Sequence, residues 1–433
     1  MNIQSQVDHG FQIYFRNYWA SHFQEIDLGL DRVSRVLQRL DCAHDFNIIT
    51  VGGTNGKGST CAMLESIYSA SRYKVGLFSS PHLLRFNERI RVDKQEVLDA
   101  EIIDAFEKIE SARKEITLTY FEFSFLAAYL IFHRADVDVA ILEVGLGGRL
   151  DAVNVLDPTC AVITNVALDH TDYLGNTREE IAREKADIFR GHGSFSVCGD
   201  EDPPSSLLEV VEEKGSDLHL LFRDFGYGEN PAGWAFWNLD GCRLNLPSLP
   251  VVGAHQLANA SVAVEVVQLL RSRLPVDNGA MRAGLVSCRS IGRIQILPLK
   301  PMIILDVAHN IASVRELVAY LNQTSFPGKT HVIFGVLSNK NYKEMIALLD
   351  GVSDRWMFCT LKSSRGLGPD NSLSALREYN HEKEARMCES VSDAIDSALK
   401  SSDANDRIIV CGSFVTVSEA LAHPLLSDTA NVS

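Results

Sequence analysis

Apolar residues in the first two-thirds of the chain follow two alternating patterns: short continuous runs, and longer runs with the spacing of a helix. The short runs are rich in β-branched residues, as expected for parallel strands that are buried on both faces. They predict strands over residues 47–50, 74–79, 137–144 and 161–166. The longer runs predict helices over residues 59–71, 95–111, 122–134 and 254–273. This alternation is typical of an α/β domain with a mostly parallel sheet.

Residues 199–249 interrupt the alternation. This region contains Pro203, Pro204 and Pro231, which together with several glycines and aromatic residues predict an irregular insertion with short strands. The alternation then resumes with predicted strands over 303–307, 331–336, 356–361 and 408–411 and predicted helices over 313–322, 343–349, 373–379 and 391–400. The sequence therefore predicts a first domain over residues 1–290 and a smaller Rossmann-like α/β domain over residues 291–433.

The segment after the first predicted strand carries the most specific chemical signal. Residues 51–60 read Val-Gly-Gly-Thr-Asn-Gly-Lys-Gly-Ser-Thr and lead into a predicted helix. Glycines let backbone N–H groups point into one concavity, the helix dipole adds positive charge, and Lys57 can reach the outer phosphates of a nucleotide. Ser59 or Thr60 offers a hydroxyl to a magnesium ion. Gly58 alters the common P-loop spacing, but the order of these parts still predicts an N-terminal P-loop-type ATPase domain.

Polar residues follow further strands, at the edge where open parallel sheets bind their ligands. Ser80, Glu143 and His170 lie at or just beyond three predicted strand ends. A buried Glu143 needs a partner, and a magnesium ion beside bound phosphates would supply one. A structural alternative stays open, in which Glu143 pairs with Arg149 and His170 is an ordinary core histidine.

Two polar segments of the second domain also follow strands. Asp306 is placed to accept a hydrogen bond from a ribose or an adenine, and His309 to contact phosphate or an incoming substrate. A strand-to-helix turn capped by Asn310 explains the same residues equally well. Residues 412–414, which include Ser413, resemble a small anion nest. Serine hydrolase, zinc peptidase and dinucleotide-binding motifs are absent from the sequence.

Composition limits the partners of the chain. A net charge of −15 disfavours binding to nucleic acid. The nine cysteines are scattered without a Cys-x-x-Cys pair, so reduced thiols are expected. The aromatic residues between positions 11 and 19 lie in no continuous apolar run, and the apolar stretch at 121–132 is too short to span a bilayer. We expect a cytoplasmic monomer without a signal peptide or a membrane partner.

Taken together, the motifs resemble one family. Along the chain occur GGTNGKGST, SSPHL, YFEF, EVGLGGRLDAVN, ALDHTDYLG, REKADIF, GRIQ, LDVAHN and CGSF. From about residue 28 to residue 416 the chain resembles bacterial bifunctional dihydrofolate synthase/folylpolyglutamate synthases of the Mur ligase superfamily. The resemblance implies an ATP-dependent amide ligase. Its implied substrates are dihydropteroate, reduced folates and L-glutamate, and its implied cofactors are ATP and one or two Mg²⁺ ions.

The resemblance also implies a role for each matched position. The triphosphate would be held by Gly53, Thr54, Asn55, Gly56, Lys57, Gly58, Ser59 and Thr60. Other ATP contacts would be Asn259, Arg293, Asp306 and His309. One Mg²⁺ would be bound by Ser80 and Glu143 with Ser59 close by, and a second by His170 and an N-carboxylated Lys185. The pteroate side would involve Phe121, Asp151, Ala152 and Asn154, and the glutamate side Ser413. The implied catalytic residues are Lys57, Glu143, His170 and Lys185.

Some positions depart from the family pattern. Asp187 stands where glycine is usual, so its carboxylate is expected either to weaken carboxylation of Lys185 or to add a metal contact. Ile294 replaces the usual phenylalanine. Three alternatives also remain: a monofunctional folylpolyglutamate synthase, a peptidoglycan-type ligase, and a nucleotide-dependent regulatory protein without ligase activity.

Overall fold

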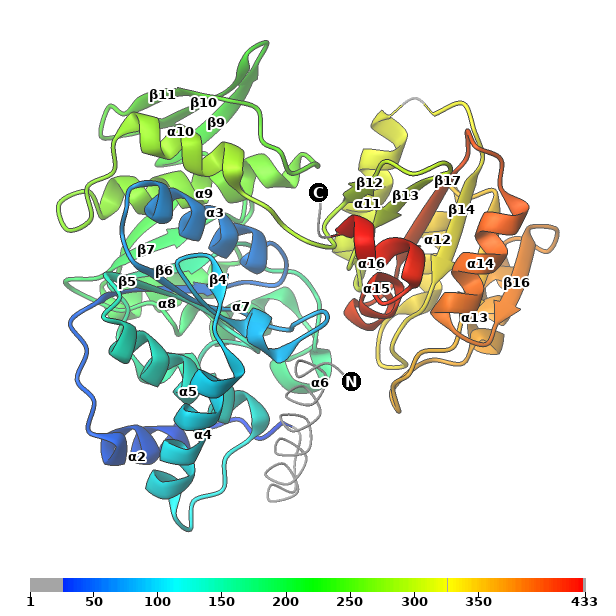
Figure 1. Cartoon of the computed structure of the whole chain (residues 1–433). Coiled ribbons are helices and arrows are strands. Elements are labelled where there is room, and N and C mark those ends of the chain that lie inside the picture. Colours follow the sequence, from blue (N-terminus) through cyan, green and yellow to red (C-terminus); the bar gives the residue numbers. More distant parts are fainter. Residues whose placement is uncertain (1–25, 325, 431–433) are drawn as a thin grey trace. The chain divides into compact units, whose positions relative to one another are not determined.

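The computed structural model describes residues 26–324 and 326–430, which form two compact units (Figure 1). The first unit comprises residues 26–248 and Ala258–Cys288, and the second comprises Leu249–Leu257 and the residues from Arg289 onward. The segment Leu249–Leu257 thus packs with the second unit, although the sequence-based division at residue 290 assigned it to the first domain. The functional division of the chain at residue 290 stays a prediction. The aromatic residues near the N-terminus lie outside the described residues.

The first unit is built on an eight-stranded sheet with the order β4-β3-β2-β5-β1-β6-β7-β8. Its strands are β1 (Asn47–Gly52), β2 (Val75–Phe78), β3 (Ile90–Val92), β4 (Gln95–Glu96), β5 (Val139–Glu143), β6 (Cys160–Ile163), β7 (Phe195–Cys198) and β8 (Asp217–Leu220). Six neighbouring strands run parallel to one another, in the order β2, β5, β1, β6, β7 and β8. The strands β3 and β4 form an antiparallel edge beside β2. Because β1 lies between β5 and β6, the loops after these three strands meet at one edge of the sheet.

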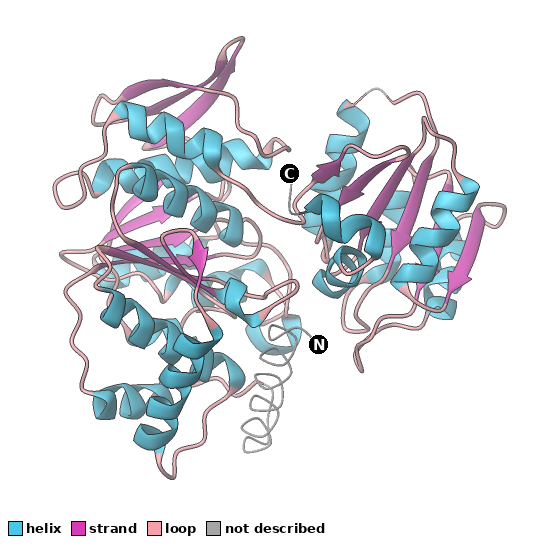
Figure 2. Cartoon of the chain, viewed as in Figure 1, coloured by secondary structure: helices cyan, strands magenta, loops and turns pink. Residues whose placement is uncertain are grey.

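Helices cover both faces of this sheet (Figure 2). One face carries α3 (Lys57–Ala70), α9 (His255–Leu269) and α10 (Asn278–Ser287). The other carries α2 (Asp31–Leu40), α4 (Asp99–Arg113), α5 (Tyr120–Ala135), α7 (Arg178–Ala186) and α8 (Ser205–Lys214), whose buried side chains form one continuous apolar cluster with the strands. Three short helices lie in loops: η1 (Phe86–Arg89), η2 (Ala152–Val155) and α6 (Thr171–Leu174). The predicted α/β architecture of this domain is confirmed.

The region over residues 199–249 is more regular than the sequence suggested. It contains α8, β8 and an antiparallel sheet of β9 (Phe225–Asn230), β10 (Gly233–Asn238) and β11 (Arg243–Leu246). The prediction of short strands is confirmed, but the expectation of an irregular insertion missed α8. Pro203 and Pro204, which contributed to that expectation, directly precede the first turn of α8, where proline is tolerated.

A buried carboxylate on α9 joins β8 and the small sheet. Glu265 is fully buried, and its Oε1 lies 2.8 Å from Nδ1 of His219. Its Oε2 accepts a hydrogen bond of 3.1 Å from Nδ2 of Asn238. Burial disfavours a charged His219, but the hydrogen bond and charge of Glu265 outweigh burial and raise the pKa of His219 above its ordinary value. The contact with Glu265 therefore favours the protonated form of His219 in the folded chain.

We expect the free energy of unfolding to decrease as pH rises through the raised pKa of His219. The His219 contribution is complete below the unfolded pKa of about 6.5 and is lost above the folded pKa. Thermal unfolding measured between about pH 5.5 and pH 8.5 should show this decrease, and His219→Gln should flatten it. The matched control is His192→Gln, which changes an exposed histidine of the same unit. The same slope in both variants would contradict the His219–Glu265 pair.

The second unit contains a six-stranded sheet with the order β12-β13-β17-β14-β15-β16. Its strands are β12 (Gln295–Leu297), β13 (Met302–Leu305), β14 (Thr330–Phe334), β15 (Arg355–Cys359), β16 (Glu384–Cys388) and β17 (Arg407–Cys411), of which only β12 is antiparallel to its neighbour. One face carries α11 (Ile311–Gln323), α12 (Tyr342–Asp350) and α13 (Pro369–Tyr379). The other carries α14 (Val391–Ser401), α15 (Phe414–Leu421) and α16 (Pro424–Ala430). The predicted Rossmann-like arrangement is confirmed.

Among residues 26–324 and 326–430, no helix combines the length and the apolarity needed to cross a bilayer.

Candidate active site

Two positions in the loop between β1 and α3 require glycine. Gly53 has a φ of +135°, and a Cβ there would lie 1.9 Å from Oγ1 of Thr164. Gly56 precedes α3 with a φ of +84°, and a Cβ there would lie 2.4 Å from Oδ1 of Asn259. Both positions combine a left-handed backbone with close neighbours, which only glycine tolerates. Asn259, a predicted ATP contact on α9, therefore lies directly against the phosphate loop.

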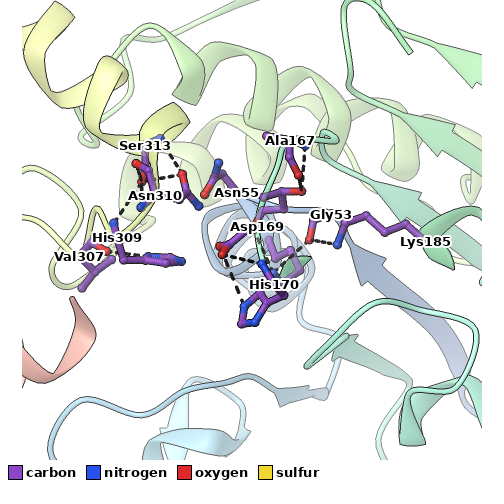
Figure 3. A network of polar contacts seen from close by, with 12 residues as sticks. Gly53, Asn55, Ala167, Asp169, His170, Lys185, Val307, His309, Asn310 and Ser313 are labelled. Carbon is purple, nitrogen blue, oxygen red and sulfur yellow. Dashed lines mark hydrogen bonds and ion pairs between the residues drawn. The ribbon is translucent and has the colours of Figure 1, made fainter. Parts of the chain in front are cut away.

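Two lysines contact one carbonyl of this loop. Nζ of Lys57 lies 3.2 Å from the carbonyl oxygen of Gly53 and 3.3 Å from that of Thr54. Nζ of Lys185, from α7, donates to the same Gly53 oxygen at 3.0 Å (Figure 3). Lys185 is only 5% exposed. The structure thus brings together two of the predicted catalytic residues, which are far apart in the sequence.

The environment of Lys185 disfavours the protonated form of its amine. Burial, and then the nearby charge of Lys57, lower the pKa of Lys185 to about 7, although Asp169 and Asp151 act in the opposite direction. A substantial fraction of Lys185 is therefore a neutral amine near pH 7. Neutral amines are nucleophiles, whereas ammonium groups are not.

Two hydroxyls at the start of α3 are suited to an ion or a phosphate. Oγ of Ser59 and Oγ1 of Thr60 are buried, and neither has a hydrogen-bond partner in the described part of the chain. Buried hydroxyls in folded proteins are normally hydrogen-bonded. Within the described residues, no three His, Cys, Asp or Glu side chains are grouped closely enough to hold a metal. The hydroxyl oxygens of Ser59 and Thr60 suit the preference of Mg²⁺ for oxygen ligands.

Glu143 and Ser80 meet at the carboxyl edge of the sheet. Glu143 ends β5 and is 3% exposed, and its Oε2 accepts a hydrogen bond of 3.1 Å from the backbone N–H of Ser80. Arg149, the alternative partner for Glu143, instead pairs with Glu184 at 2.9 Å. The two residues expected to share one metal ion thus lie side by side.

His170 begins the short helix α6 in an unusual backbone conformation. Its φ of +52° is left-handed, which is uncommon for a residue other than glycine and concentrates at functional sites. Its backbone N–H donates to Oδ1 of Asp169 at 2.8 Å, and its Nε2 lies 4.0 Å from Oδ2 of the same carboxylate (Figure 3). Because the His170 side chain is 40% exposed, it is not a core histidine.

The residues expected on the pteroate side support the loop after β5. Asp151 is buried, accepts hydrogen bonds from the N–H groups of Leu146 and Val153, and has a pKa raised by burial to about 7. Asn154 donates to the Arg149 carbonyl oxygen at 3.0 Å. These contacts hold the loop in shape.

Two more residues of this set are closely packed. The ring of Phe121 packs against Gly145, where a Cβ would lie 2.5 Å from a ring carbon. Ala152 opens η2 and is buried. Contact of these residues with a substrate stays a prediction.

Asp187 has a partner away from Lys185. Its Oδ1 lies 2.6 Å from Nζ of Lys214, which also donates to the Asp187 carbonyl oxygen at 2.8 Å. The carboxylates whose charge acts on Lys185 are those of Asp169 and Asp151. The substitution of the usual glycine is therefore accommodated by an ion pair with α8.

In the second unit, Asp306 holds the turn that carries Arg293. Its two carboxylate oxygens accept hydrogen bonds of 2.8 Å from the N–H groups of Ile294 and Ala308. Burial raises the pKa of Asp306. Ile294 has a φ of +47°, a strained conformation for a β-branched residue. Asp306 thus fixes the backbone beside Arg293.

The remaining predicted residues of this unit gather around Phe414. The Arg293 guanidinium carbon lies 5.9 Å from the centre of the Phe414 ring, and the ring centres of His309 and Phe414 are 5.5 Å apart. Ser413 caps α15 and accepts a hydrogen bond of 3.0 Å from the N–H of Thr416.

The alternative interpretation of Asn310 is also confirmed. Its Oδ1 accepts from the N–H of Ser313 at 2.9 Å, which caps α11 (Figure 3). This cap accounts for Asn310 and leaves the role of His309 open.

A buried arginine, Arg89, was not predicted from the sequence. Arg89 ends η1, is 7% exposed, and donates from Nε to Nδ1 of His82 at 2.8 Å. Its guanidinium carbon lies 4.7 Å from the centre of the Tyr120 ring. Burial lowers the pKa of His82 to about 4, so its imidazole is neutral and accepts this bond. Burial also lowers the pKa of Arg89, although the nearby charges of Tyr120 and Glu143 act in the opposite direction. Arg89 follows no strand of the parallel sheet, so the strand-end rule could not find it.

Comparison with known proteins identifies the class. Residues 51–267 match the family model of the Mur ligase middle domain, and residues 292–414 match that of the Mur ligase, glutamate ligase domain. The fold, the phosphate loop and these matches together define a Mur ligase.

Full-length relatives narrow the identification. The chain is 41% identical over 401 residues to the dihydrofolate synthase/folylpolyglutamate synthase of Escherichia coli K12, with 92% of each chain covered. The structure of E. coli FolC in complex with DHPP and ADP matches with a TM-score of 0.90, 39% identity and 98% of both chains covered. A bifunctional folylpolyglutamate synthase/dihydrofolate synthase with Mn, AMPPNP and L-glutamate bound matches with a TM-score of 0.86 and 42% identity, covering 95% of this chain and 97% of the other. The chain belongs to the dihydrofolate synthase/folylpolyglutamate synthase family of Mur ligases.

Proposed function

We propose that the chain is an ATP-dependent ligase that adds L-glutamate to 7,8-dihydropteroate and to reduced folates. The observation that supports this most is the convergence of Lys57, Lys185 and the Glu143–Ser80 pair at one edge of the first sheet. A regulatory protein that hydrolysed ATP without making an amide would not need His170 and Lys185 together with Asp306 and His309. The relatives with ADP, DHPP, AMPPNP, Mn and L-glutamate supply the substrates and the divalent ion of the proposal.

The reaction requires activation of a carboxylate, since carboxylates do not react with amines directly. The γ-phosphoryl group of ATP passes to the carboxylate, which gives an acyl phosphate and ADP. The amine of glutamate then attacks the acyl carbon and loses a proton to solvent, an amide bond forms, and inorganic phosphate leaves with the electrons of the broken C–O bond. Lys57 and the N-terminus of α3 neutralise charge on the transferring phosphoryl group. Catalysis is therefore mainly positioning and electrostatic stabilisation.

Two groups of residues would hold divalent ions. Ser59, Ser80 and Glu143 offer oxygen atoms for one Mg²⁺ ion, and His170 with Lys185 would hold a second. When bound, the ions neutralise negative charge on the phosphates. An ammonium group cannot bind a cation, so we propose that Lys185 is N-carboxylated. Its neutral amine adds carbon dioxide, loses one proton and becomes a carbamate, and the lowered pKa of Lys185 supports this step.

The other ligand contacts follow the same proposal. The phosphate loop and Asn259 of the first unit, and Arg293, Asp306 and His309 of the second, bind ATP. The glutamate substrate contacts Ser413, and the pteroate group contacts the region of Phe121, Asp151, Ala152 and Asn154. A cytoplasmic location agrees with the nine free cysteines, all of which lie in the described part of the chain.

ADP release separates this function from its alternatives. We expect release that depends on glutamate together with either dihydropteroate or a reduced folate. Release with the reduced folate alone as acid substrate would instead indicate the monofunctional synthase. ATP hydrolysis that is indifferent to both acids and to glutamate would contradict the ligase and favour a regulatory protein.

Arg89 gives a further prediction. Its buried guanidinium lies against the Tyr120 ring, and the charge of Glu143 acts on its pKa, so we propose that Arg89 binds the carboxylate that is to be phosphorylated. Arg89→Ala should lower kcat/KM for the acid substrate by about 100-fold but leave the affinity for ADP unchanged. Steady-state kinetics and ADP titration check this. The matched control is Arg85→Ala, which removes an exposed arginine of the same turn. Equal effects of the two variants would contradict the proposed role.

A further inference from the structure

The phosphate loop is held by a side chain that no motif singled out. Asn165 lies two residues after the end of β6, and its carboxamide contacts the backbone of Asn55 in two places. Oδ1 of Asn165 accepts a hydrogen bond of 3.0 Å from the Asn55 N–H, and its Nδ2 donates one of 3.1 Å to the Asn55 carbonyl oxygen. The Asn165 carbonyl oxygen also accepts from the N–H of Thr54 at 2.9 Å. Asn165 therefore forms hydrogen bonds with two successive residues of the loop, Thr54 and Asn55.

Neighbouring residues of the same segment strengthen this contact. Oγ1 of Thr164 donates to the Asn55 carbonyl oxygen at 2.6 Å. The N–H of Ala167 donates to Oγ1 of Thr54 at 3.0 Å (Figure 3). The Asn55 carbonyl thus accepts two hydrogen bonds from one side, from the side chains of Thr164 and Asn165.

The direction of that carbonyl determines the direction of the next N–H. In a trans peptide, the C=O of one residue and the N–H of the following residue point in opposite directions. The Asn55–Gly56 bond is trans, so holding the Asn55 carbonyl against Asn165 turns the Gly56 N–H away from Asn165. Glycine at position 56 would otherwise let this peptide rotate with little steric resistance. A rotated peptide would present a carbonyl oxygen, with partial negative charge, where the loop needs a donor.

We propose that Asn165 is a positioning residue, which fixes the Asn55–Gly56 peptide so that the Gly56 N–H faces the β-phosphate of a bound nucleotide. The inference rests on the ATP site of the proposed function. It assigns to Asn165 no contact with the nucleotide. Preorganised backbone donors of this kind lose much of their value when their direction is not fixed.

Asn165→Ala removes both side-chain bonds without adding charge. We expect the Kd for ADP and the KM for ATP to rise about tenfold or more. The Kd for AMP, which lacks the β-phosphate, and the KM for glutamate should stay unchanged. Thr164→Val removes one donor to the same carbonyl and should act in the same direction with a smaller effect. Titration with ADP and with AMP, combined with steady-state kinetics, measures these changes.

A matched control separates positioning from stability. Asn230 ends β9 in the same unit, is half-buried like Asn165, and accepts a hydrogen bond of 3.0 Å from the N–H of Ala232. Asn230→Ala should leave both nucleotide affinities unchanged. If Asn165→Ala does not fold, Thr164→Val decides the question. Equal loss of ADP and AMP affinity, or unchanged ADP affinity in both loop variants, would overturn the inference.

These measurements distinguish a failure of the role of Asn165 from a failure of the proposed ligase function. If the unmodified chain binds ADP but forms no amide, the ligase assignment fails, while the ratio of ADP to AMP affinities still decides the role of Asn165. If the unmodified chain binds no ADP, the inference is overturned together with the ATP site.

Discussion

Lys57→Ala is expected to lower the rate of glutamate-dependent ADP release by about 1,000-fold or more, because a transferring phosphoryl group loses a main cationic partner. Lys57 is the first residue of α3, so its ammonium adds to the positive end of the helix dipole. Its Nζ already lies over the loop carbonyls of Gly53 and Thr54. Steady-state ADP release with dihydropteroate and glutamate measures the effect.

The control for this prediction is Lys343→Ala. Lys343 is exposed in the second unit and forms an ion pair of 2.6 Å with Glu378, so its loss should leave the rate unchanged. Thermal unfolding of both variants shows whether either change affects stability. A Lys57→Ala variant that is folded and retains near-normal turnover would refute the role of the loop in phosphoryl transfer.

The second large effect is expected at Lys185. Lys185→Ala should lower the same rate by about 100-fold or more, since a ligand that fixes a catalytic ion is lost. Formate or acetate should then restore part of the rate, because each can supply the missing carboxylate. In the unmodified chain, removal of dissolved carbon dioxide should lower the rate, and intact-mass measurement under gentle conditions should detect the added carbon dioxide.

Lys214→Ala is the matched control for Lys185. Lys214 is half-buried in the same unit. Its Nζ forms an ion pair with Asp187 and donates a hydrogen bond to the Phe189 carbonyl oxygen. The Lys214→Ala variant should show neither the loss of ADP release nor its restoration by formate or acetate. A Lys185→Ala variant that small acids do not rescue, together with an unmodified mass in active protein, would contradict the carbamate.

Strands that are buried on both faces were the easiest elements to predict. β1, β5 and β14 consist mainly of apolar and β-branched residues and are buried along almost their whole length, so their sequence pattern differs from that of half-exposed strands. β16 was missed because it lies at the sheet edge, where Glu384 and Arg386 face solvent and break the run. α10 was missed although Asp277 caps it, because Gly279 and Gly284 lower its helix propensity. Gly284 is required by its packing, since a Cβ there would lie 2.5 Å from the backbone of Ile67.

The predicted site residues also divide into those that a local sequence pattern reveals and those that only contacts between distant segments reveal. The phosphate loop is local, so the order of strand, glycines, lysine and hydroxyls is visible in ten successive residues. The contact of Lys185 with Gly53 spans 132 residues, and the sequence-based role of Lys185 depended on resemblance to the family. Arg89 and Asn165 were not found, because their importance lies in contacts with His82, Tyr120 and Asn55 that no spacing rule describes.

The sequence by itself determined the α/β class of both units, the phosphate loop and the family, because short-range patterns of glycine, charge and hydrophobicity carry this information. The tertiary structure alone decided that Lys185 is buried beside Lys57, that Asp187 pairs with Lys214, and that Asn165 holds the Asn55 peptide. The physical reason is that burial, charge proximity and hydrogen-bond direction arise only when distant segments pack together. These quantities control the protonation and orientation of the reacting groups.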